Sequence, residues 1–192
     1  MKPQKTLTHK GVTIEIHQDQ DAQSPYEWGD EGLFLVANHR DFYVPEPGEI
    51  RVTNDASELV ERWKETHWIF RLEAYIHSGV VLALSREGNF PDRQWDVSQL
   101  GFVFASKKEW LLPKSARKAA LSLISGWNMY LAGDVWGYVV DPDGINEESC
   151  WGFYGFDYCV EEAKSVAEHV AKKKQEETKE AELMACRDIV TA

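Results

Sequence analysis

Cysteine and histidine side chains are the first candidates for chemistry, because thiolates and imidazoles bind transition metals and act as nucleophiles or bases. Eight residues separate Cys150 from Cys159, and Cys186 stands apart, so the three cysteines form neither a C-x-x-C pair nor an even disulfide set. The six histidines include no H-x-x-x-H pair. We therefore predict reduced thiols, no metal site and no cofactor.

A cysteine nucleophile would require a base close to it in space. Cys150 is the candidate, with Asp134 beside it and His39, His67 or His77 as the base, but no local sequence signature accompanies these residues. The chain also lacks the G-x-x-x-x-G-K-[ST], G-x-G-x-x-G and G-x-S-x-G motifs. An enzyme acting on a small molecule or a nucleotide signal is thus the alternative interpretation. We favour a protein without catalytic residues.

Acidic side chains interleaved with aromatic ones form the sharper candidate site, near the N-terminus. Carboxylates with aromatic anchors suit a partner whose surface is basic, where charge accelerates association and aromatic side chains supply binding energy. In the alternative interpretation this is a solvated loop whose aromatic residues tuck into the sheet. The predicted partner-binding residues are Asp19, Asp21, Tyr26, Glu27, Trp28, Asp30, Glu31, Asp41, Glu46 and Glu49.

The net charge bears on the class of partner. The chain has a formal charge of −11, of which residues 1–50 contribute −5, with nine acidic against four basic residues. Because DNA affinity that is independent of sequence comes from Lys and Arg on phosphates, direct nucleic-acid binding is disfavoured. No apolar run approaches the roughly 18 residues of a membrane span, and the N-terminus has no signal-peptide pattern. We expect a cytoplasmic protein, in the host cell, with no membrane partner.

The stretch ESCWGFYGFDYC, residues 148–159, combines five aromatic residues with two cysteines. Alternation places Cys150, Gly152, Tyr154 and Phe156 on one face of a strand, and Trp151, Phe153 and Gly155 on the other. Because aromatic residues occupy both faces, we predict a central strand buried under helices, with an aromatic ligand-binding patch as the alternative.

Hydrophobic periodicity predicts the elements that position these residues. Alternating patterns indicate strands at 12–17, 33–37, 68–77, 80–85, 101–106 and 135–140, and the stretch from 148 pairs with the last of them. The 68–77 and 80–85 strands form the strongest hairpin. Helical spacing indicates helices at about 55–65, at 115–131 and from about 158 onward.

These elements predict one α+β domain over residues 1–192. It contains a mainly antiparallel sheet of six or seven strands, two packed helices, and a longer, partly exposed C-terminal helix. Residues 172–192 read as a polar helical extension, because KKKQEETKE has no apolar face. Its end, ELMACRDIV, is a candidate contact with a second subunit, so a homodimer through this helix is expected.

Three segments carry a resemblance: QWDVSQLGFVFASKKEW, YLAGDVWGYVV and ESCWGFYG. In them the chain resembles an uncharacterised family of small proteins encoded by phages and related mobile elements, over roughly residues 68–156. The shared motifs are W-D before G-F, Y-x-x-G-D-V and S-C-W-G-F-Y-G, which fall here on Trp95, Asp96, Gly101, Phe102, Tyr130, Gly133, Asp134, Val135 and Ser149–Gly155. The resemblance implies an origin and brings no catalytic residue.

Small, acidic products of mobile elements often act as accessory or counter-defence factors. The resemblance and the charge together predict a non-enzymatic inhibitor of the anti-CRISPR or anti-restriction type. Its expected partner is a host protein or ribonucleoprotein complex that handles nucleic acid, bound through the acidic surface. A structural or assembly factor that oligomerises through the C-terminal helix is a further alternative.

Overall fold

The structure, a computed structural model, describes residues 2–28, 32–40, 42–47, 56–76, 79–85, 87–88, 90 and 97–190. The chain divides into two compact units. Unit 1 consists of Met1–Ala22 and Gly133–Ala192, and unit 2 of Gln23–Ala132. Each unit has its own antiparallel sheet and its own hydrophobic core.

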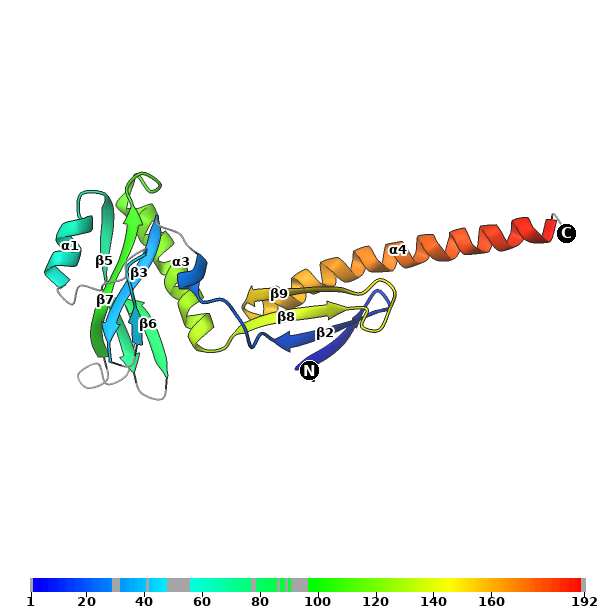
Figure 1. The fold of residues 1–192 in the computed structure, drawn as a ribbon, viewed down its shortest axis with the longest axis horizontal. Helices are drawn as coiled ribbons and strands as arrows, with labels where there is room; N and C mark the ends of the chain where they lie inside the picture. The colour runs from blue at the N-terminus through cyan, green and yellow to red at the C-terminus, as the bar shows by residue number, and fades with distance from the viewer. Residues whose placement is uncertain are drawn as a thin grey trace. The chain divides into compact units, whose positions relative to one another are not determined.

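Unit 1 is a four-stranded sheet covered on one face by a long helix, α4 (Phe156–Val190) (Figure 1). The strand order is β1 (Lys5–His9), β2 (Val12–Gln18), β8 (Val135–Val140) and β9 (Glu148–Tyr154). Ile14 and Ile16 of β2 alternate with polar residues, as the sequence predicted, and both are fully buried against α4. Ala163 and Ala167 supply the facing side of the helix.

The start of α4 is fixed by Asp134, which precedes β8. Its Oδ1 accepts hydrogen bonds from the Phe156 backbone amide at 3.1 Å and from the Trp136 indole at 2.5 Å. A carboxylate there satisfies an amide that the first helical turn leaves unpaired. From Lys172 to Met184 almost every side chain is exposed, which confirms the long, partly exposed C-terminal helix.

Unit 2 is a five-stranded sheet with a helix on each face. Helix α3 (Pro113–Leu131) buries Leu123, Ile124 and Trp127 against one face, and α1 (Ala56–Trp63) places Leu59 on the other, beside Phe34 and Phe104. The strand order is β4 (Phe42–Val44), β3 (Leu33–His39), β7 (Val97–Ser106), β5 (His67–Ile76) and β6 (Val80–Leu84).

The α+β class, the antiparallel pairing and the β5–β6 hairpin are confirmed. The strand count was wrong in detail, because the described strands number nine and form two sheets, where one sheet of six or seven was expected. Periodicity missed the short strands β1 and β4. Residue 55, the expected start of the first helix, lies outside the described residues, as do Trp95 and Asp96. None of the helices in the described ranges combines the length and hydropathy that a transmembrane span requires.

Candidate functional site

The predicted partner-binding residues are spread over both units. Asp19 and Asp21 belong to unit 1, while Tyr26, Glu27, Trp28 and Glu46 belong to unit 2. The other four, Asp30, Glu31, Asp41 and Glu49, lie outside the described residues.

Asp19 has a structural role at the end of β2. Its carboxylate accepts hydrogen bonds from the backbone amides of Asp21 and Gly152, both at 3.1 Å. Asp21 is exposed and Asp19 is half-buried, so Asp21 in particular contributes negative charge to the surface.

The segment with Tyr26, Glu27 and Trp28 is a short 3-10 helix, η1 (Pro25–Trp28). The Glu27 carboxylate accepts a hydrogen bond from the Ser24 amide at 2.6 Å, as in a capping box. The Trp28 ring packs on Gly126 of α3 and is still 48% exposed. The aromatic residue therefore rests on a helix, not on the sheet, and remains accessible beside an exposed Tyr26.

Glu46 does not lie on an exposed acidic surface. It is fully buried, and its carboxylate accepts hydrogen bonds from Arg62, at 3.0 and 3.2 Å, and from the Trp63 indole at 3.0 Å. A buried carboxylate is stable only with such partners. Glu46 therefore anchors α1 and is not available to another protein.

The aromatic stretch forms an edge strand, so the prediction of a buried central strand was wrong. β9 ends the strand order of its sheet, and its residues from Glu148 to Gly152 are exposed. The pairing of β8 with β9 shifts between Trp136 and Tyr138, and Gly152 adopts a φ of 84° at this bulge. At the bulge, the Trp151 ring lies over Gly137, in the space that a side chain at position 137 would occupy.

Aromatic residues flank the β9 edge from both faces of the sheet. On the face away from α4, Trp151 lies 5.9 Å from the buried His17 ring, centroid to centroid, and is 44% exposed. On the α4 face, Phe153 contacts Tyr158, which is 58% exposed. Glu147 and Glu148 at the start of β9 and Asp157 in the first turn of α4 are exposed acids.

Unit 1 also carries most of the net charge. Residues 1–22 and 133–192 contain 17 acidic against 9 basic residues, so this unit contributes −8 of the formal −11. Residues 1–22 are neutral, with three acidic against three basic residues, so the whole excess of unit 1 comes from residues 133–192, with 14 acidic against 6 basic residues. We call the exposed edge with Trp151, Tyr158, Glu147, Glu148 and Asp157 the β9 surface.

The residues of the alternative cysteine site are divided between the two units, with Cys150 and Asp134 in unit 1. Cys150 is exposed, and Asp134 caps α4. His39 and His67 belong to unit 2, and His77 lies outside the described residues. Burial raises the pKa of the Cys159 thiol to about 12, with a smaller contribution from Cys150. In the part of the chain that the structure describes, no three His, Cys, Asp or Glu residues are placed to hold a metal ion.

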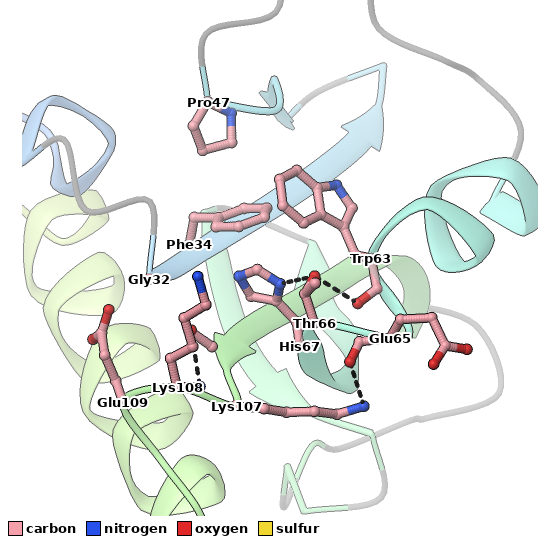
Figure 2. A pocket seen from close by; sticks show the side chains of 11 residues that line it. Gly32, Phe34, Pro47, Trp63, Glu65, Thr66, His67, Lys107, Lys108 and Glu109 are labelled. Atoms are coloured by element: carbon pink, nitrogen blue, oxygen red, sulfur yellow. Dashed lines mark hydrogen bonds between the residues drawn. The ribbon is translucent and has the colours of Figure 1, made fainter.

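Unit 2 contains a pocket of about 620 Å³ that the sequence did not predict (Figure 2). Phe34 from β3, Trp63 from the end of α1 and His67 from the start of β5 line it, and Lys108 follows β7 at its rim. Phe34 and His67 are buried. We call this cavity the His67 pocket. Its lining residues come from four separate segments, so no local motif could have revealed it.

Hydrogen bonds fix the polar residues of the His67 pocket. The Thr66 hydroxyl lies 2.9 Å from the His67 Nδ1 atom, and the Ser106 hydroxyl accepts a hydrogen bond from the Lys108 amide at 3.2 Å. The Lys107 ammonium donates to the carbonyls of Lys64 and Glu65. It therefore points away from the rings, whereas the Lys108 ammonium points toward Phe34 and His67 (Figure 2).

Comparison with protein-family models, curated proteins and solved structures finds no match to this chain. The resemblance to proteins of phages and mobile elements therefore stays a prediction.

Proposed function

We propose that the protein is a non-enzymatic accessory protein of a phage or mobile element. It acts as a counter-defence inhibitor, of the anti-CRISPR or anti-restriction type, by binding a host complex that handles nucleic acid. The observation that carries the proposal is the β9 surface, an edge strand with accessible aromatic rings on both faces in the more acidic of the two units.

Charge supports a basic partner. A net charge of −8 on unit 1 steers it toward the Lys- and Arg-rich grooves that receive nucleic acid, and repels nucleic acid itself. Such steering raises the association rate at low salt, and it weakens as the Debye length shrinks to about 8 Å at physiological ionic strength.

The edge strand supports the mode of binding. A strand at the edge of a sheet presents backbone donors and acceptors that an extended segment of another protein can pair with. Trp151 and Tyr158 would then contact that segment from the two faces of the sheet. Trp and Tyr are enriched among the residues that dominate binding energy, so these two are the expected anchors.

The test uses a panel of purified CRISPR effector complexes and restriction enzymes, with DNA cleavage and salt-dependent capture as the readouts. We expect inhibition of one panel member, and capture weakened at least about tenfold by Trp151→Ser or by Glu147→Lys with Glu148→Lys. The matched control is Asp30→Lys with Glu31→Lys, which reverses two charges near the N-terminus.

Two results would contradict different parts of the proposal. If the Asp30 and Glu31 variant loses capture while the β9 variants retain it, the interface lies at the N-terminal acids and not at the β9 surface. If no panel member is inhibited or captured at either salt concentration, the counter-defence function is wrong.

A structural or assembly role is the second candidate, favoured by the exposed end of α4. Contacts from the β8–β9 loop reach α4 at Lys174 and Glu177. Beyond them, Leu183 and Met184 are 59% and 65% exposed. Sedimentation of the full chain and of the Leu183→Glu variant tests a homodimer through this helix. A monomer at all concentrations in the full chain would exclude it.

A further inference from the structure

We infer that the His67 pocket binds a small, planar aromatic or heteroaromatic molecule that carries one anionic group. The pocket lies within unit 2, and the inference does not depend on the partner surface of unit 1.

Three rings provide the apolar part of the site. The Phe34, Trp63 and His67 rings meet edge to face in pairs, with centroid separations of 5.1 Å, 5.6 Å and 4.8 Å. Phe34 is held from behind by stacking on Phe104 at 4.9 Å. Rings that are already packed lose little conformational entropy when a ligand binds, and aromatic partners prefer offset-stacked or edge-to-face contacts with them.

The orientation of the rings is set by the surrounding polar contacts. The Trp63 indole donates to the buried Glu46 carboxylate at 3.0 Å, and the Thr66 hydroxyl holds the His67 imidazole at Nδ1. The Trp63 ring is thus held from outside the cavity, and the His67 ring by a residue of the cavity wall. A preformed aromatic cavity with a few placed polar groups is the usual character of a small-molecule site.

Lys108 provides the positive charge of the His67 pocket. Its ammonium points to the rings, whereas the Lys107 ammonium is bound by two backbone carbonyls on the far side (Figure 2). Of the two acids at the rim, the Glu65 side chain points away from the rings, and the Glu109 carboxylate packs against Gly32 (Figure 2). A ligand over the rings thus meets a cation, which favours an anionic group.

The size of the pocket limits the ligand. A volume of about 620 Å³ lies within the roughly 300–1,000 Å³ of small-molecule sites. It holds one ring system with a short anionic substituent. A phosphate and a carboxylate satisfy the same contacts, so two ligand sources share this chemistry: a mononucleotide and an aromatic carboxylic acid.

The experiment is a titration of the ¹⁵N-labelled full chain, observed by NMR at the Trp63 indole and the His67 ring. Two anionic probes, AMP and indole-3-acetate, are each compared with a neutral relative, adenosine and indole-3-ethanol. We expect saturable shifts at both residues with at least one anionic probe, and much weaker binding of its neutral relative. The probe that binds more tightly identifies the source of the ligand.

Lys108→Gln tests the charge without disturbing the core, since this side chain is exposed. It should weaken binding of the anionic probe about tenfold and leave the neutral probe unchanged. Lys118→Gln on α3, an exposed lysine outside the pocket, is the matched control and should have no effect. The inference is overturned if neither anionic probe shifts these signals at millimolar concentration, or if Lys108→Gln leaves anion binding unchanged.

Discussion

The Asp19 carboxylate accepts a hydrogen bond from the Gly152 amide at 3.1 Å, although 133 positions separate the two residues in the chain. The contact joins the end of β2 to the bulge of β9 across β8. An acidic residue that the sequence assigned to a binding surface thus helps to shape the edge strand.

Replacing Asp19 should therefore loosen the bulge. Asp19→Ala removes the acceptor for two amides and should lower the free energy of unfolding of unit 1 by about 1 kcal/mol. Asp19→Asn keeps an acceptor oxygen and should cost less. Amide exchange at Gly152, followed by NMR, is the direct readout. Unchanged exchange in Asp19→Ala would mean that the hydrogen bond contributes nothing in solution.

Local periodicity predicted the elements whose burial is set within one stretch of chain. The alternation of 68–77 and the apolar stripe of 115–131 correspond to β5 and α3. The division into two units was not predictable in this way, because unit 1 combines the first 22 residues with the last 60. Pairing between β2 and β8 depends on contacts that no local pattern encodes.

The candidate sites were harder to predict than the elements. In ESCWGFYGFDYC the aromatic residues suggested burial on both faces, but Gly137 and the bulge at Gly152 let Trp151 cover a neighbouring strand while β9 stays at the edge. Glu46 appeared as one more surface acid because its partner Arg62 lies 16 positions away. Burial of a charge depends on such partners, and sequence composition does not reveal them.

The ion pair between Glu46 and Arg62 predicts that replacing Arg62 destabilises unit 2 more than replacing Glu46 does. Arg62→Met leaves a fully buried carboxylate without its cation and should destabilise unit 2 by about 3 kcal/mol. Glu46→Gln leaves Arg62, whose side chain is 36% exposed and can be solvated, and keeps an oxygen for the Trp63 indole. It should cost less. Urea denaturation measures both, and a larger loss for Glu46→Gln would contradict this account.

The raised pKa of the buried Cys159 thiol predicts that the protein loses stability at alkaline pH. Burial raises the pKa of its thiol from 9.0 to about 12, so above pH 9 the unfolded chain releases a proton that the folded chain retains. The contribution of the thiol to the free energy of unfolding is fully present below pH 9. It is lost as pH rises toward 12, by at most about 1.4 kcal/mol per pH unit. Burial also raises the pKa of Tyr138, which acts in the same direction.

Urea denaturation between pH 8 and about pH 10.5 tests this dependence. Cys159→Ala should flatten the alkaline decline, although it creates a small cavity that lowers stability at every pH. Cys150→Ser, at an exposed position, is the control and should keep most of the slope. An equal slope in Cys159→Ala and in the unchanged protein would show that other groups cause the decline.

The packing of Trp151 on Gly137 predicts that two substitutions are coupled. A Cβ at Gly137 would overlap the indole, so Gly137→Ala should displace the ring and destabilise unit 1 by about 1–3 kcal/mol. When Trp151→Ser has already removed the ring, the same substitution should cost little, since a methyl group then has room. The double-mutant cycle in urea measures this coupling.

Gly152→Ala is the matched control: no atom lies within 4 Å of its added Cβ, so its cost comes from the positive φ and should persist without Trp151. If Gly137→Ala costs the same with and without the tryptophan, the ring does not rest on Gly137, and the aromatic anchor proposed for the β9 surface loses its support.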